Sequence, residues 1–183
     1  MSQGSLLRKF ELELADADRG VYESLELRLA QHKSESDDYL VTRVLAWCLC
    51  WEPELVIAPE LCQAEEPALS VRDPHGRIRL WVEIGLPTGE RIHKASKASD
   101  RVLVFPHRSP QALEKNWAGM RIHRAGEIEA VVPDPELVAR LAATLDRNNR
   151  WHVTVSDGEL IVDSGRGTFT GPIHRFRPLE SDA

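Results

Sequence analysis

The sequence predicts a single α/β domain built on a mixed sheet. Alternating apolar and polar residues near both ends predict β-hairpins, while strand-like and helix-like patterns follow one another in the middle of the chain. Strand–helix–strand alternation requires at least one parallel crossover, and hairpins at both ends make the sheet mixed. The chain has 183 residues, 42% of them hydrophobic, which suits one domain with its own core.

The N-terminal part predicts a hairpin followed by a helix. Residues 6–14 and 21–29 alternate between apolar and polar side chains, with turn-forming residues between the two segments. Ser34 and Ser36 are candidate N-caps for an apolar helix that Pro53 ends.

The rest of the chain predicts shorter elements. These are strands at 69–72 and 77–84 joined by a turn at 73–76, a helix at 90–99, a strand at 102–105, a helix at 110–118, a strand at 129–132, a helix at 135–147, and a closing hairpin of 151–155 with 160–162. The polar segment from His174 to Ala183 is expected to be a mobile tail. The domain is therefore expected to span residues 1–173.

The N-terminus and the cysteines favour an intracellular protein. The first residues lack a signal-peptide pattern, and no apolar run approaches the roughly 18 residues that cross a bilayer. We therefore expect a cytoplasmic protein without a membrane partner. An odd set of cysteines (Cys48, Cys50 and Cys62) is not a disulfide framework. Buried thiols are favoured over a metal site, because no further ligand follows at finger spacing.

Positive charge is concentrated in one segment of an acidic chain. Residues 91–124 contain eight Lys/Arg and two acidic residues, a charge of +6, so a total of −6 leaves −12 for the other residues. Such a segment predicts a nucleic-acid contact, with a set of solvated helix faces as the alternative. The eight residues are Arg91, Lys94, Lys97, Arg101, Arg108, Lys115, Arg121 and Arg124.

Glu83 is the acidic residue that most suggests chemistry. It lies late in a strand whose other face is apolar, and a Gly-Leu-Pro bend follows. The carboxyl edge of a sheet is where α/β proteins bind ligands. The alternative is a surface carboxylate paired with Arg79 or Arg91.

Other acidic residues also stand at the ends of elements. Glu35 precedes the first helix, Glu66 precedes the strand at 69–72, and Lys94 lies on the short basic helix. Carboxylates that converge can bind Mg²⁺ or Mn²⁺, and a nearby lysine can orient water or stabilise a phosphate. These are the parts that phosphodiester hydrolysis needs.

Five strings of the sequence resemble the YaeQ family in order and spacing, over roughly residues 5–165. The strings are His32-Lys33-Ser34-Glu35-Ser36, Thr42-Arg43-Val44-Leu45-Ala46, Glu66-Pro67-Ala68-Leu69, Leu80-Trp81-Val82-Glu83-Ile84-Gly85-Leu86-Pro87 and Arg91-Ile92-His93-Lys94-Ala95. The resemblance implies a restriction-endonuclease-like PD-(D/E)XK core with flanking helices and a variant active-site motif.

The resemblance also implies roles for single residues. Glu35 matches the helix acid and Glu83 matches the acidic residue of the motif. The motif lysine position falls on Gly85, so Lys94 is the substitute. These roles make Glu35, Glu66, Glu83 and Lys94 the predicted catalytic residues, with the three glutamates as metal ligands.

The chain departs from the family pattern at the first motif aspartate. Ala68 stands there, and an alanine cannot bind a metal. Either Glu66 or Glu65 takes its place, or the site has lost a ligand. Arg43, two helical turns after Glu35, is expected to bind phosphate or to pair with Glu35 or Glu83.

Three hypotheses follow. The chain is a Mg²⁺- or Mn²⁺-dependent nuclease, a non-catalytic module that binds nucleic acid or a protein on the same fold, or a structural protein with coincidental acidic residues. Ala68 favours the second hypothesis over the first, and the family-like strings weigh against the third.

Overall fold

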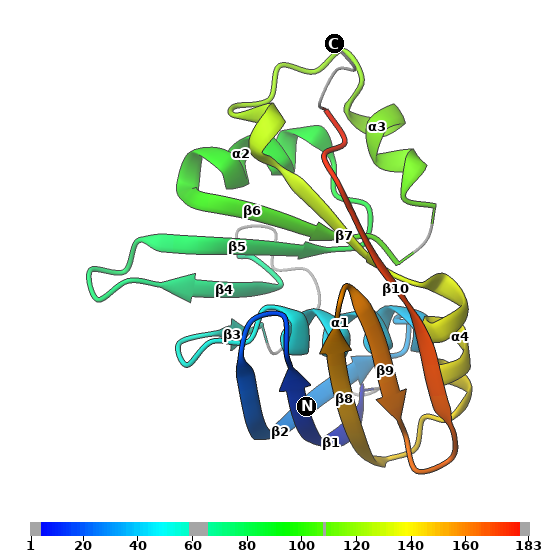
Figure 1. The fold of residues 1–183 in the computed structure, drawn as a ribbon. Coiled ribbons are helices and arrows are strands. Elements are labelled where there is room, and N and C mark those ends of the chain that lie inside the picture. The colour runs from blue at the N-terminus through cyan, green and yellow to red at the C-terminus, as the bar shows by residue number, and fades with distance from the viewer. Residues whose placement is uncertain (1–4, 59–65, 108, 180–183) are drawn as a thin grey trace. The chain divides into compact units, whose positions relative to one another are not determined.

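The computed structural model describes residues 5–58, 66–107 and 109–179, which form a mixed α/β fold (Figure 1). The strands are β1 (Ser5–Asp16), β2 (Val21–His32), β3 (Val56–Ile57), β4 (Leu69–Arg72), β5 (Ile78–Ile84), β6 (Ser99–Phe105), β7 (Glu129–Pro133), β8 (Asn148–Ser156), β9 (Glu159–Asp163) and β10 (Thr168–Phe176). The helices are α1 (Asp37–Leu49), α2 (Gly89–Ala98), α3 (Gln111–Trp117), the 3₁₀ turn η1 (Ala125–Glu127) and α4 (Pro135–Ala143).

The chain divides into two compact units. The first unit comprises residues 1–51 and 133–174, and the second comprises residues 52–132 and 175–183. The mixed α/β class predicted from the sequence is confirmed. Within the described residues, no helix is both long and apolar enough to cross a bilayer.

The sheet of the first unit has the strand order β2-β1-β8-β9-β10. The predicted N-terminal hairpin is confirmed, since β1 and β2 pair antiparallel along their whole length, from Ser5 opposite His32 to Asp16 opposite Val21. β1 runs parallel to β8, and β8 and β9 form the second predicted hairpin. The alternating pattern of β1 places Phe10, as expected, in the core.

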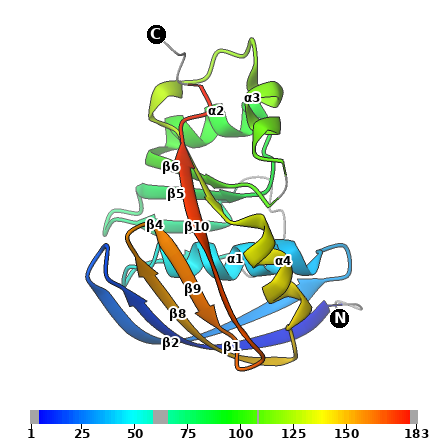
Figure 2. The same cartoon turned by 45° about the vertical axis from the view of Figure 1, so that its right-hand side comes forward.

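Helix α1 is the centre of the first unit. It crosses the inner side of the curved sheet, and α4 lies on the same side (Figures 1 and 2). Ser36 is its N-cap and accepts a hydrogen bond from the backbone N–H of Tyr39. All residues from Leu40 to Leu49 are buried, so the helix contributes more than one face to the core.

The C-terminal end of α1 is fixed by the first hairpin. Arg19, in the β1–β2 turn, donates from Nη2 to the Cys48 carbonyl at 2.9 Å and from Nη1 to the Trp51 carbonyl at 3.1 Å. Its Nε donates to the buried Asp16 carboxylate at 2.6 Å. These bonds place a cation on carbonyls at and just beyond the C-terminal end of the helix, where the Cys48 carbonyl also accepts from the Trp51 N–H at 3.3 Å.

Cys48 on α1 and Cys50 at its C-cap are buried thiols, as predicted. Burial raises the pKa of the Cys48 thiol to about 12, which keeps it protonated at neutral pH. Cys62 lies outside the described residues.

The sheet of the second unit has the strand order β7-β6-β5-β4-β3. β4 and β5 form the predicted antiparallel hairpin, and the Asp73 carboxylate fixes its turn by accepting from the N–H groups of His75 and Arg77. β5, β6 and β7 are parallel, with α2 as the crossover from β5 to β6. A buried cluster that includes Trp81, Ile92 and Trp117 forms the core on the helix side.

Some element boundaries differ from the prediction. The helix predicted at 135–147 ends at Ala143, and Asn148 already begins a strand. The short strand β3 was not predicted, nor was β10, which continues through Phe176 into the segment expected to be a mobile tail. The Asn149 side chain explains the early helix end, because it bonds the backbone N–H and carbonyl of Asp146.

Candidate functional site

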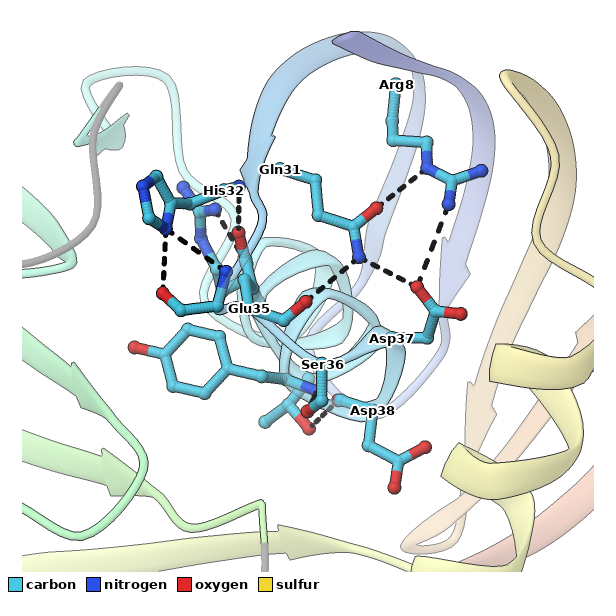
Figure 3. Close-up of polar contacts among 11 residues, drawn as sticks. Arg8, Gln31, His32, Glu35, Ser36, Asp37 and Asp38 are labelled. Atoms are coloured by element: carbon cyan, nitrogen blue, oxygen red, sulfur yellow. Dashed lines mark hydrogen bonds and ion pairs between the residues drawn. The ribbon is translucent and has the colours of Figure 1, made fainter. Parts of the chain in front are cut away.

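Glu35 lies in the tight turn that connects β2 to α1. Its backbone N–H donates to the carbonyl of His32 at 2.9 Å, and the N-cap Ser36 follows directly. Figure 3 shows the turn with the residues around it. The sequence therefore places Glu35 correctly at the start of the helix.

The Glu35 carboxylate is buried and paired with Arg43. Its Oε1 accepts from Arg43 Nη1 at 2.9 Å, and the two side chains are 0% and 3% exposed. Its Oε2 accepts from the backbone N–H of His32 at 3.3 Å. Of the roles expected for Arg43, pairing with Glu35 is confirmed.

A polar network that the sequence analysis missed holds this turn in place. The amide nitrogen of Gln31 donates to the Glu35 carbonyl at 3.2 Å and to the Asp37 carboxylate at 2.7 Å. The amide oxygen accepts from Arg8 Nε at 2.9 Å (Figure 3). The sequence did contain an indication that Gln31 faces inward. In the alternating pattern of β2, Gln31 lies on the same side of the strand as the buried Leu27 and Leu29.

In the second unit, Glu83 is buried within β5. The sequence predicts one apolar face on this strand, but from Leu80 to Ile84 both faces are buried, with Trp81 only 2% and Glu83 only 4% exposed. The strand lies between β4 and β6, so neither of its edges faces water.

One oxygen of Glu83 receives two donors. Trp81 Nε1 donates to Oε1 at 2.6 Å, and Arg91 Nε donates to the same oxygen at 2.8 Å. Of the two arginines expected as partners, Arg91 is therefore the observed one. Arg79 instead lies 3.7 Å from Glu52.

Glu66 and Ala68 lie beside this strand at the start of β4. The Glu66 carboxylate is exposed and accepts from Arg72 at 2.8 Å, while its main-chain carbonyl accepts from Arg91 Nη2 at 2.8 Å. Ala68 directly precedes β4, and its N–H donates to the carbonyl of Val82 at 3.0 Å, so it lies beside the part of β5 where Glu83 follows Val82. Glu65, the other expected substitute, lies outside the described residues.

Gly85, the position that the resemblance aligns with a motif lysine, has a backbone conformation that disfavours a side chain. Gly85 follows β5 with a φ of 94°, and its N–H donates to the Phe105 carbonyl at 2.8 Å. A residue with a side chain rarely adopts this conformation. A lysine at position 85 would strain the bend. Lys94 lies exposed on α2.

Each predicted metal ligand has an arginine beside it. Each of Glu35, Glu66 and Glu83 is paired with an arginine, and the described parts of the chain contain no group of three His, Cys, Asp or Glu residues able to hold a metal ion. Glu35 belongs to the first unit and the other predicted site residues to the second, so their convergence on Lys94 stays a prediction.

The basic segment divides into two kinds of residue. Three arginines are engaged in the fold: Arg91 with Glu83, Arg101 with Glu129, and Arg124 with the carbonyls of Ser96 and Ser99. Four others have exposed side chains: Lys94, Lys97, Lys115 and Arg121. Arg108 lies outside the described residues.

These features define a mixed α/β protein in which a buried acidic residue, Glu83, lies on strand β5, which forms a β-hairpin with β4. A family model described as YaeQ protein matches residues 1–172, and the chain belongs to the YaeQ family. The YaeQ protein of Escherichia coli K12 is 30% identical over 160 residues, which cover 86% of this chain and 88% of the relative. The Salmonella typhi relative is 29% identical over 168 residues, or 91% of this chain and 92% of its own.

Two solved structures are similar to the chain over almost its whole length. The crystal structure of the Xanthomonas axonopodis pv. citri YaeQ protein has a TM-score of 0.84 at 31% identity, covering 94% of this chain and 98% of that one. The Pseudomonas syringae YaeQ structure has a TM-score of 0.84 at 27% identity, covering 96% and 97%.

Proposed function

We propose that this protein is a nucleic-acid-binding member of the YaeQ family on a PD-(D/E)XK nuclease-like fold, with a degenerate metal-dependent nuclease site. Glu66 and Glu83 of the second unit are the remnant ligands for Mg²⁺ or Mn²⁺, and Lys94 is the remnant lysine, while Glu35 of the first unit stays the predicted helix acid. Metal binding at this site is weak and phosphodiester hydrolysis is slow. The protein still binds nucleic acid although its catalytic activity is weak or absent.

The observation that carries the proposal is the position of Ala68 beside the strand that carries Glu83. The N–H of Ala68 donates at 3.0 Å to the carbonyl of Val82, the residue before Glu83. The family-like pattern expects an aspartate at position 68, and a hard cation loses affinity with each carboxylate that is removed from its shell. Mn²⁺ binds such oxygen sites somewhat more tightly than Mg²⁺ does.

Exposed basic residues support the binding part of the proposal. Lys94 and Lys97 lie one turn apart on α2, Lys115 lies on α3, and Arg121 follows α3. Cations that neutralise phosphates release counterions, which makes binding depend on salt and not on sequence. A non-catalytic protein-binding module is the competing function, and it predicts no such salt dependence.

The test is nucleic-acid affinity as a function of salt. The association constant is measured by fluorescence anisotropy with labelled single- and double-stranded DNA and RNA, in EDTA. Its logarithm is expected to fall linearly with the logarithm of the salt concentration. The double variant Lys94→Ala/Lys97→Ala is expected to lower the slope on duplex DNA by about 1.8, or about 0.9 per phosphate contact.

Arg140→Ala is the matched control, since Arg140 is an exposed cation on α4 outside the basic segment. Its slope is expected to equal that of the wild type. Absence of binding to every nucleic acid at low salt would refute the proposal and favour the protein-binding module.

A further inference from the structure

The buried carboxylate of Glu83 carries a charge that needs compensation. Its side chain is 5% exposed, and its Oε1 is 2.8 Å from Arg91 Nε. A carboxylate taken out of water remains ionised only with an opposite charge or several hydrogen-bond donors beside it. Arg91 supplies the charge, and the Trp81 indole supplies a further donor.

The guanidinium of Arg91 bonds two kinds of oxygen at once. Nε binds the Glu83 carboxylate, and Nη2 binds the main-chain carbonyl of Glu66 at 2.8 Å. Carboxylate and carbonyl oxygens are also the ligands that Mg²⁺ and related cations take from proteins. Arg91 therefore contacts the same atoms that would surround an ion bound between β5 and the start of β4.

An ion and the guanidinium cannot share this position. A divalent cation sits about 2.0–2.6 Å from its oxygen ligands, which would place it within a few ångströms of a guanidinium bound to the same carboxylate. Two like charges at that separation repel strongly in a site that is mostly closed to water. Because Ala68 adds no negative charge, the site attracts a divalent cation less strongly, and occupation by the Arg91 guanidinium is favoured over occupation by the metal ion.

We propose that Arg91 is a built-in cation that takes the place of a divalent metal ion at Glu83. This inference deepens the proposed function and rests on it, because it gives the physical reason why the nuclease-like site is degenerate. Glu35 is compensated in the same manner by Arg43 in the first unit. The family-like acidic residues serve as partners of arginines. Removal of the Arg91 guanidinium would leave the oxygens of Glu83 and Glu66 able to bind a metal ion.

Calorimetric titration of the full chain with Mn²⁺ tests this. The variant Arg91→Gln is expected to bind Mn²⁺ at least tenfold more tightly than the wild type, because Glu83 then lacks its cation. Arg91→Lys keeps the charge and is expected to behave like the wild type. If the glutamine variant is unfolded by circular dichroism, Arg91→Met keeps the aliphatic stem and replaces it.

Two controls make the result specific. Arg101→Gln removes another ion-paired arginine of the same unit and is expected to leave Mn²⁺ affinity unchanged. Adding Glu83→Gln to Arg91→Gln is expected to abolish the gain. Equal affinity of wild type and Arg91→Gln, or a gain that survives Glu83→Gln, would overturn the inference. Nucleic-acid affinity in EDTA is read separately, so its loss would count against the proposed function and not against the role of Arg91.

Discussion

Replacing Arg43 with alanine is expected to lower the free energy of unfolding by about 3–5 kcal/mol. The change removes the only charged partner that the described residues offer Glu35, whose side chain is 0% exposed. A buried charge without its partner costs far more than the intact pair contributes. Urea unfolding followed by circular dichroism measures the loss.

The matched control is Arg140→Ala on α4. Arg140 pairs with Glu136 at 3.5 Å, and both side chains are exposed, so this change is expected to stay within about 0.5 kcal/mol. Replacing both partners, as Glu35→Leu with Arg43→Met, is expected to recover much of the stability that Arg43→Ala loses. An effect of Arg43→Ala as small as that of Arg140→Ala would contradict the pairing described for Glu35.

Glu83→Ala is expected to destabilise the protein by about 2–4 kcal/mol. It leaves the buried Trp81 indole N–H without the Glu83 acceptor and removes the Glu83 carboxylate that pairs with Arg91. The estimate is below that for Arg43 because the Arg91 side chain is 24% exposed and water screens it in part. Urea unfolding again gives the value.

This result separates two roles of Glu83. A buried carboxylate that serves only as a metal ligand lowers the free energy of unfolding when the metal is absent. Its removal is then neutral or stabilising. Glu66→Ala is the comparison, because Glu66 pairs with Arg72 on the surface. This substitution is expected to change the free energy of unfolding by less than about 1 kcal/mol. A stabilising Glu83→Ala would show that Arg91 does not compensate Glu83.

The sequence predicts the fold well where one pattern acts over many residues. The alternating segments of β1 and β2 and the N-cap Ser36 were all found, because each is a local preference that the tertiary structure keeps. β10 was missed because Gly171 and Pro172 interrupt its pattern, and these residues weaken a strand prediction. β3 has two residues and is defined only by its pairing with β4.

The candidate site was predictable in its acidic positions and less so in their partners. Glu35 and Glu83 stand at ends of elements, and that placement is local information. Which cation compensates each one depends on the path of the chain, so both arginines appeared only among open alternatives. Gln31 was missed because a polar residue at an inward strand position acquires meaning only when Arg8 and Asp37 are in place around it.

The most direct test of the proposed degenerate nuclease site is cleavage of single- and double-stranded DNA and RNA by the wild type and by Glu83→Ala, in Mg²⁺ and in Mn²⁺. Because Ala68 contributes no ligand and Arg91 neutralises Glu83, we expect wild-type cleavage in Mg²⁺ to be no faster than that of Glu83→Ala. Slow cleavage by the wild type in Mn²⁺, increased by Ala68→Asp, is compatible with the account. Robust cleavage by the wild type in Mg²⁺ that Glu83→Ala abolishes would contradict it and establish an active nuclease.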